Sequence, residues 1–191
     1  IKGLSRAGAE RLVRARAQRG FRDMQDLASR ARLSQRDLHA LATAGALVTL
    51  AGHRHRARWE ALGAEPTPPL FQDWAIAEPE PQLPVPTEAQ NLIADYASLG
   101  LTLGRHPLAL LRARIRRMGC QPARALTSLP DGAPVRIMGL VITRQHPSTA
   151  AGVVFITIED ETGHANIIVW QTLVERYRKE VLGSRLLQVT G

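Results

Sequence analysis

The chain has 191 residues, of which 45% are hydrophobic but only 4% aromatic, so aliphatic side chains must build its core. Its apolar runs are far shorter than the roughly 20 residues that cross a bilayer, and it opens at Ile1 with no secretion signal, so we expect neither a membrane protein nor a secreted one. Cys120 is the only cysteine, which excludes an internal disulfide and favours a reducing cytosol.

The net charge of +8 is distributed unevenly along the chain. Residues 1–62 carry 13 Lys and Arg against 5 Asp and Glu, whereas residues 63–100 carry none against 6. Residues 101–134 are basic again, with 6 against 1, and residues 135–191 are nearly neutral, with 6 against 5. A basic block beside an acidic spacer is typical of a module that binds phosphates.

The first half of the chain is predicted to be helical and then extended. Apolar residues recur at helical spacing through residues 1–62, and Ser34 followed by Asp37 predicts the start of a helix that Gly45 ends. Residues 63–86 hold seven of the twelve prolines, so they cannot keep regular hydrogen bonding and are predicted to be a linker.

The second half begins with helices and continues with strands. Residues 87–133 are predicted to be a helical connector, because Thr87 and Gln90 form a capping-box pattern and Pro107 fits a first helical position. Residues 134–191 are predicted to form the strands 135–143, 153–158, 165–170 and 186–189, with a turn at 160–163 and a helix over 175–182. This order is that of an OB-fold barrel without its fifth strand.

The predicted fold class is therefore α+β. It combines a helix-hairpin-helix region over residues 1–62, a proline-rich linker over 63–86, a helical connector over 87–133 and an incomplete five-stranded OB-fold barrel over 134–191.

Residues 1–5 have the spacing of a helix-hairpin-helix turn. Gly3 is expected to take a positive φ, which would let N–H groups near a helix N-terminus face a phosphate. The candidate DNA-binding residues here are Lys2, Gly3, Arg6 and Arg11. The same pattern also fits a helix pair with a purely structural role.

Residues 44–47, with the sequence Ala-Gly-Ala-Leu, are a candidate second hairpin. The DNA-binding candidates here are Gly45, Arg54 and Arg56. We interpret His53 and His55 as part of a solvated basic helix rather than as metal ligands, because no cysteine or carboxylate lies near them in sequence.

The barrel supplies candidates for binding a single strand. OB folds stack bases on aromatic side chains beside a basic rim, which points to Arg136, Arg144, Phe155, Asn166 and Trp170. Either aromatic side chain could instead fill the core.

No catalytic or metal site is predicted. The acidic run Glu159–Glu161 is interpreted as solvated turn residues rather than as a two-metal site. The sequence has no nucleophile–base pair, phosphate-cradling loop or zinc-ligand spacing elsewhere.

Residues 136–191 resemble the C-terminal OB domain of bacterial C-family DNA polymerases. The resemblance rests on Gly139-Leu140-Val141, on the run from Phe155 to Gly163 and on Glu175-Arg176-Tyr177. Upstream, His106-Pro107-Leu108 and Ile1-Lys2-Gly3-Leu4 match the same family. The Arg-rich helical block and the sequence from Ala165 to Trp170 are most similar to its error-prone branch.

The resemblance implies a DNA-directed DNA polymerase that acts in damage-induced mutagenesis and translesion synthesis, in the bacterial cytoplasm at the nucleoid. Its polymerase carboxylates, and the Mg²⁺ they hold, would lie upstream of Ile1, so this segment would be non-catalytic and would need no cofactor. The implied partners are duplex and single-stranded DNA and an inactive Y-family-like mutagenesis protein. Replicative members carry a clamp-binding Gln-x-x-Leu-Phe peptide; here Thr67 replaces the Gln before Leu70-Phe71, so we expect weak or no clamp binding.

The sequence also fits two alternative functions. The chain could be a protein-interaction module that docks the mutagenesis partner, or the equivalent part of a replicative alpha subunit. An independent hydrolase or nuclease has no residues to support it.

Overall fold

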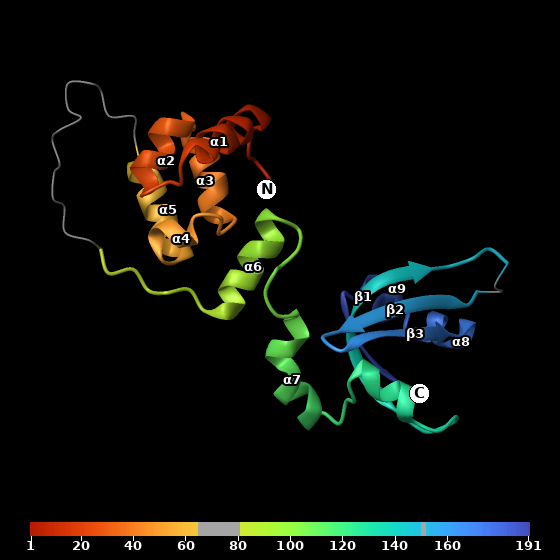
Figure 1. Cartoon of the computed structure of the whole chain (residues 1–191). Coiled ribbons are helices and arrows are strands. Elements are labelled where there is room, and N and C mark those ends of the chain that lie inside the picture. Colours follow the sequence, from red (N-terminus) through yellow and green to blue (C-terminus); the bar gives the residue numbers. More distant parts are fainter. Residues whose placement is uncertain (65–80, 150–151) are drawn as a thin grey trace, which may run out of the picture. The chain divides into compact units, whose positions relative to one another are not determined.

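The computed structural model describes residues 1–64, 81–149 and 152–191 (Figure 1). The chain divides into two compact units, residues 1–103 and residues 104–191. The first unit is helical and the second is built on an antiparallel sheet, so the predicted α+β class is confirmed. Most of the predicted linker lies outside the described residues, and the predicted connector over 87–133 contributes one α-helix to each unit.

The first unit contains six helices among its described residues. They are α1 (Arg6–Gln18), α2 (Met24–Ala31), α3 (Gln35–Thr43), α4 (Val48–Ala51), α5 (Arg54–Gly63) and α6 (Glu88–Ser98). Side chains cap their N-termini as predicted: Ser34 accepts from the Asp37 N–H, and Thr87 and Gln90 form the expected capping box.

The core of this unit is made of leucine and alanine. Leu27 and Leu38 are each 1% exposed, and Ala31, Ala42 and Ala57 are completely buried. Because alanine leaves little space between helix axes, α1, α2, α3 and α5 pack closely without aromatic residues.

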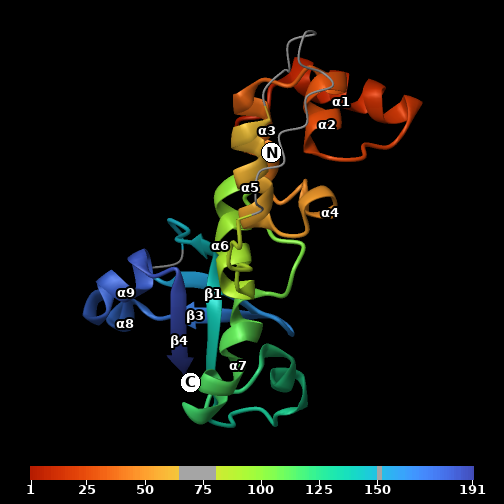
Figure 2. The same cartoon turned by 90° about the vertical axis from the view of Figure 1, so that its left-hand side faces the viewer.

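The second unit begins with α7 (Pro107–Arg117) and the 3₁₀ turn η2 (Ala123–Ser128). Its remaining elements are β1 (Arg136–Gln145), β2 (Val154–Asp160), β3 (Gly163–Val169), α8 (Gln171–Arg176), α9 (Arg178–Gly183) and β4 (Leu186–Thr190). The sheet order is β3-β2-β1-β4, and every pairing is antiparallel. Figure 2 shows β4 beside β1. The four predicted strands are therefore present, in one antiparallel sheet.

The helix predicted over 175–182 differs in the structure. It begins at Gln171 and is divided into α8 and α9, because Tyr177 leaves helical geometry at φ −117° and ψ 37°.

Alternate residues of the strands divide between the two faces of the sheet. The inner face packs against Val174 of α8 and Val181 of α9 and consists of Ile137, Val154, Ile156, Ile158, Ala165 and Val169. On the outer face, Leu108 and Ile115 of α7 pack with Met138 and Leu140. This helix therefore covers part of the outer face.

The buried side of α7 includes an arginine. Leu111 is 43% exposed, whereas Arg112 is buried. The buried positions Leu108, Arg112 and Ile115 are spaced by four and three residues, which puts them on one side of a helix.

No helix among residues 1–64, 81–149 and 152–191 is long and apolar enough to cross a membrane.

Candidate nucleic-acid interface

The first hairpin, residues 1–5, has the predicted turn. Some of its polar groups form hydrogen bonds within the first unit. Gly3 has φ 84°, as expected. The Lys2 N–H donates to Ser98 O at 2.9 Å, and Lys2 Nζ donates to Ala97 O at 3.0 Å. Lys2 thus holds the hairpin to the C-terminal end of α6, although its side chain is exposed.

A buried carboxylate lies directly behind this hairpin. The Ser5 N–H donates to Asp37 Oδ1 at 2.8 Å, and the Ser5 hydroxyl donates to Oδ2 at 3.0 Å. Burial raises the pKa of Asp37, but the hydrogen bonds from Ser5 and Ser34 and the charge of Arg11 together bring that pKa below its ordinary value of 3.8. A Cβ at Gly8 would lie 2.5 Å from Asp37 Oδ2, which explains a glycine in the first turn of α1.

Other donors near the hairpin lie on exposed residues. The Gly3, Arg6 and Ala7 N–H groups have no hydrogen-bond partner among the described residues. The Arg6 side chain is 95% exposed and pairs with Glu10 Oε1 at 3.0 Å, an ion pair that water screens strongly. The start of α1 therefore offers backbone donors and a cation to an anion from solvent.

Arg11, in contrast, is used within the unit. Its Nε donates to Ala31 O and its Nη2 to Arg32 O, both at 3.0 Å. These carbonyls end α2, where Arg32 takes a left-handed conformation at φ 46°. Arg11 is thus a C-terminal cap of α2 rather than the freely projecting cation that the sequence predicted.

The second hairpin, residues 44–47, also contacts buried groups of the first unit. Gly45 has φ 72°, and its N–H donates to Ala42 O, which ends α3. Arg54 is only 8% exposed: its Nη1 donates to Asn91 O at 2.7 Å, and its Nη2 pairs with Asp95. A Cβ at Gly45 would lie 2.6 Å from that Nη2, so the guanidinium lies directly beneath the hairpin.

Arg54 was predicted to lie on the surface, and this geometry corrects that prediction. Its guanidinium is buried because it bonds Asn91 and Asp95 of α6. Arg56 stays on the surface, where it pairs with Glu60 at 2.7 Å. His53 accepts from the Arg56 N–H and so caps α5, and His55 lies 2.8 Å from Pro84 O, so neither is a purely solvated side chain.

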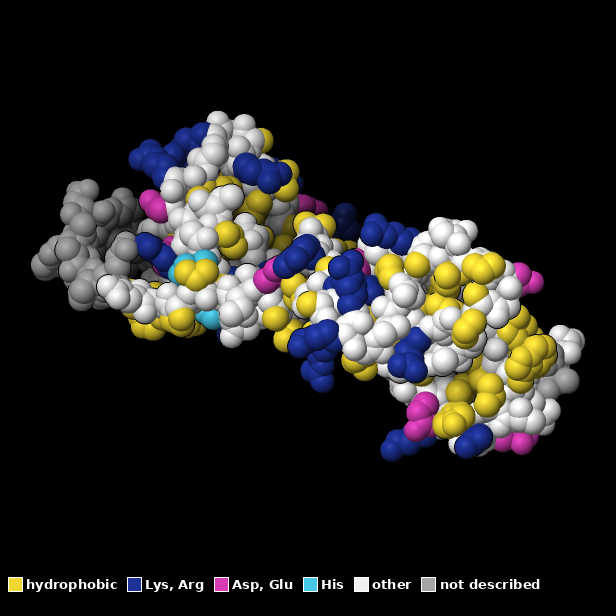
Figure 3. All heavy atoms as spheres, turned by 90° about the horizontal axis from the view of Figure 1, so that it is seen from below, with side chains coloured by type: hydrophobic (Ala, Val, Ile, Leu, Met, Phe, Trp, Pro, Cys, Tyr) yellow, Lys and Arg dark blue, Asp and Glu magenta, His cyan; other side chains and the backbone are white. Residues whose placement is uncertain are grey.

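The surface of the first unit keeps several cations without partners. Arg14, Arg16, Arg36 and Arg58 are exposed, and no hydrogen bond or ion pair joins their side chains to a described residue. Figure 3 shows Lys and Arg side chains in dark blue at several places on the surface. The predicted basic surface is therefore present, although other arginines than those predicted supply much of it.

In the second unit, the outer face of β2 and β3 brings several predicted residues together. Phe155 lies opposite Ile168, and Thr157 lies opposite Asn166. Phe155 is 38% exposed, Ile168 53% and Trp170 63%, so the two aromatic residues do not fill the core. The Thr157 hydroxyl is 2.9 Å from Asn166 Oδ1. Ile168 was missed, although strand alternation from Asn166 would have found it.

The two predicted arginines of β1 lie away from this face. Arg136 is exposed and donates to Met118 O at 3.1 Å. Arg144 donates through Nε to Val181 O at 2.7 Å and through Nη2 to Ser184 O. It points to the inner side of the sheet, where it satisfies carbonyls at the end of α9, so it does not form the rim that the sequence predicted.

Asp160 and Glu161 of the acidic run are paired inside the unit, which corrects the interpretation from sequence, whereas the Glu159 side chain is 43% exposed. Arg112 Nη2 lies 2.8 Å from Asp160 Oδ2 and 2.7 Å from Glu161 Oε2. Asp160 is 4% exposed and also accepts from the Ala123 N–H. Burial raises the pKa of Asp160, and hydrogen bonds from Thr162 and Ala123 with the charge of Arg112 bring it below its ordinary value. The carboxylates of Asp160 and Glu161 thus form ion pairs with the buried guanidinium of Arg112.

No group of three or more His, Cys, Asp or Glu side chains within the described part of the chain could hold a metal ion.

Comparisons with known proteins find a matching motif and relatives that align with the whole chain. A model of the helix-hairpin-helix motif matches residues 1–57. Over its full length the chain is 52% identical to a protein of Alkalilimnicola ehrlichii, 50% identical to one of Pseudomonas paraeruginosa and 50% identical to one of Methylococcus capsulatus. All three are named error-prone DNA polymerase, and the chain spans 18% to 19% of their length.

Proposed function

The chain corresponds over its whole length to a segment of the error-prone DNA polymerases, and from this premise we propose that it forms a DNA-binding part of such an enzyme. The correspondence confirms the resemblance seen in the sequence. The observation that best supports the proposal is the first hairpin, where unpaired N–H groups at the start of α1 lie beside the exposed Arg6. Such an arrangement binds phosphate oxygens without reading a base sequence.

In this proposal the first unit holds the duplex backbone. The N–H groups of Gly3 and Arg6 meet a phosphate, and the Arg6 side chain adds charge. Lys2 has an exposed ammonium that can leave Ala97 O for a phosphate, whereas Arg11 and Arg54 shape the hairpins from inside. The cations without internal partners, such as Arg14 and Arg36, add long-range attraction.

The second unit then meets single-stranded template. We assign it to the OB folds, because its strand order matches and its helices lie between the third and fourth strands. Phe155, Ile168 and Trp170 give a surface on which bases stack, and Asn166 beside them has an amide for hydrogen bonding.

The proposal for the whole protein joins the name of its relatives, error-prone DNA polymerase, to what the resemblance in the sequence implies. It is a DNA-directed DNA polymerase of damage-induced mutagenesis and translesion synthesis, which works with Mg²⁺ held by residues of the remaining sequence and lies in the cytoplasm at the nucleoid. Its partner is an inactive Y-family-like protein. The clamp prediction concerns Thr67, Leu70 and Phe71, which lie outside the described residues, and weak clamp binding stays our proposal.

Duplex binding tests the first unit. Arg6→Ala should weaken the affinity for every duplex sequence about fivefold, equivalent to about 1 kcal/mol, and should flatten the dependence of log affinity on log salt by about 0.9. Fluorescence anisotropy at about 50 mM and about 200 mM salt measures both quantities. Arg19→Ala is the matched control, because Arg19 follows the other end of α1 and pairs with Asp26. Unchanged affinity and slope in Arg6→Ala would make this hairpin structural.

Single-strand binding tests the second unit. Phe155→Ala and Trp170→Ala should each weaken binding to an oligothymidine by about fivefold or more, because a stacked base contributes about 1–3 kcal/mol. Tyr177→Ala removes another exposed aromatic side chain and should leave this affinity unchanged.

The interaction module remains a second candidate function for the second unit. The high exposure of Ile168 and Trp170 favours it, because a protein interface also buries apolar side chains. If neither aromatic substitution changes binding to single strands, this function replaces the first.

A further inference from the structure

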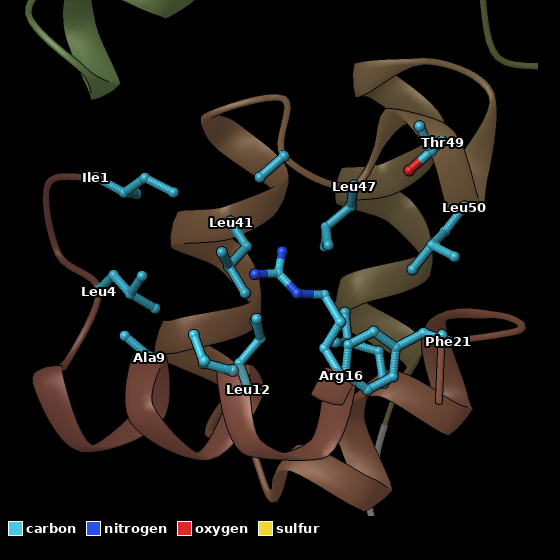
Figure 4. A pocket seen from close by; sticks show the side chains of 14 residues that line it. Ile1, Leu4, Ala9, Leu12, Arg16, Phe21, Leu41, Leu47, Thr49 and Leu50 are labelled. Atoms are coloured by element: carbon cyan, nitrogen blue, oxygen red, sulfur yellow. The ribbon is translucent and has the colours of Figure 1, made fainter. Parts of the chain in front are cut away.

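The first unit contains a groove of about 450 Å³ between its two hairpins (Figure 4). Ile1 and Leu4 of the first hairpin, Leu12 of α1, Leu47 and Leu50 around α4, and Phe21 form its apolar walls. Val13 at this groove is 52% exposed. A contiguous apolar surface of this kind differs from single exposed leucines and typically marks a binding site.

Arg16 is the one charged residue of this lining. Figure 4 shows its side chain extending from α1 between Leu41 and Leu47. No hydrogen bond or ion pair joins it to another described residue, and the lining contains no Asp or Glu. The carboxylate of Asp26, in the first turn of α2, is paired with Arg19 and Arg30.

These features define the chemistry of an occupant. A DNA backbone is charged along its whole length and does not match walls of leucine, isoleucine and phenylalanine. An apolar ligand without charge would leave the Arg16 guanidinium under a covering surface with no acceptor, which costs free energy. The occupant must therefore bring apolar side chains and one anion together.

We propose that this groove binds a short amphipathic segment of a partner protein, whose apolar side chains contact the leucines and whose Glu or Asp pairs with Arg16. An apolar helix face in a groove is a common mode of peptide recognition, and arginine binds a carboxylate through two parallel N–H groups. Both hairpins contribute to the walls, so the occupied groove lies beside the start of α1 that we assign to phosphate binding.

A set of three synthetic peptides tests the proposal. Each is an amphipathic helix of about four turns with leucine at i, i+3 and i+7, and they differ only in a central Glu, Gln or Lys. The 191-residue chain should bind the Glu peptide about tenfold more tightly than the Gln peptide, and the Lys peptide more weakly still. Changes in the amide NMR signals of Arg16, Thr49 and Leu50 locate the binding.

The variant Arg16→Gln should remove the tenfold preference for Glu while leaving the affinity for the Gln peptide unchanged. Arg14→Gln is the matched control: it is exposed on the same helix but does not line the groove, and it should keep the preference. Both variants should melt like the unchanged chain, because neither side chain is buried.

Three outcomes would overturn the proposal. The first is equal binding of all three peptides, and the second is a preference for Glu that survives Arg16→Gln. The third is self-association of the chain, measured by light scattering, that Arg16→Gln abolishes while no peptide binds; the groove would then belong to a second copy. The peptide measurements contain no DNA, so their failure leaves the phosphate-binding proposal standing.

Discussion

Asp37 determines the local form of the first hairpin. Its two oxygens accept from the backbone and hydroxyl of Ser5, and the same hydroxyl accepts from the Gly8 N–H. The carboxylate thus takes up donors at the start of α1 from the inside, and the N–H groups of Gly3 and Arg6 keep no partner among the described residues. A buried acid and an outward anion site can share one helix N-terminus because they use different N–H groups.

The variant Asp37→Asn should lower the free energy of unfolding of the first unit by about 1–3 kcal/mol at pH 7, because charge-assisted hydrogen bonds are lost in a buried place. The folded-state pKa of Asp37 is lowered, so its contribution is complete above the ordinary value of 3.8 and is lost as pH falls through the folded-state pKa. Urea unfolding followed by circular dichroism should therefore show a gap between variant and parent that closes below about pH 3.8.

The control for this prediction is Asp23→Asn. Asp23 caps α2 by accepting from the Asp26 N–H, and asparagine caps a helix equally well. Its effect should stay within a few tenths of a kcal/mol. A gap for Asp37→Asn that is independent of pH would contradict the role of its charge.

Individual side chains were the least predictable part of the site. Arg11, Arg54 and Arg144 each look like surface cations in the sequence, yet each donates to carbonyls or carboxylates of a segment far away along the chain. Local spacing contains no information about such a partner. By comparison, the positive φ of Gly3 was predictable, because the hairpin pattern itself requires it.

At the scale of elements, Arg112 joins α7 to the turn between β2 and β3. Its guanidinium bonds Asp160 and Glu161, and Asp160 in turn accepts from the backbone of η2 at Ala123. One of its nitrogens, Nη1, is buried without a protein partner among the described residues. Three elements therefore meet at one partly buried ionic cluster.

The variant Arg112→Met should lower the free energy of unfolding of the second unit by about 3–5 kcal/mol, because two carboxylates lose their buried cation. Adding Asp160→Asn and Glu161→Gln to it should restore part of this loss, since no unpaired charge is left. Arg114→Met, on the exposed side of α7, should change stability little. Guanidinium unfolding measures all three variants, and equal effects of Arg112→Met and Arg114→Met would contradict the role of the cluster.

The elements themselves were largely readable from local sequence signals. Three such signals depend only on residues close together in the chain, and the structure contains all of them. They are the capping box at Thr87, the proline at the start of α7 and the alternation along β2. The break at Tyr177 was not predicted, because residues on both sides of it have helical character. The burial of Arg112 could not be predicted either, since its partners lie in another element.

At the scale of the whole molecule, each unit has a hydrophobic core of its own. That of the first unit centres on Leu27 and Leu38, and that of the second on Ile156 and Ile158. No described residue belongs to both of these cores. The two units also differ in charge. The first contains the strongly basic block of residues 1–62, whereas residues 135–191 of the second are nearly neutral.

Separate cores predict separate unfolding. Arg112→Met should speed amide hydrogen exchange at Ile156 and Val189 while leaving Leu27 and Leu38 unchanged, and Asp37→Asn should do the reverse. The reason is that amides deep in a core exchange only when their own cooperative unit opens, so a substitution reports on the unit that contains it. Exchange measured by mass spectrometry on peptides from both units distinguishes the cases. If either variant accelerated exchange equally in both cores, the chain would unfold as one cooperative body, and weaker DNA binding by a variant of one unit could then also reflect unfolding of the other.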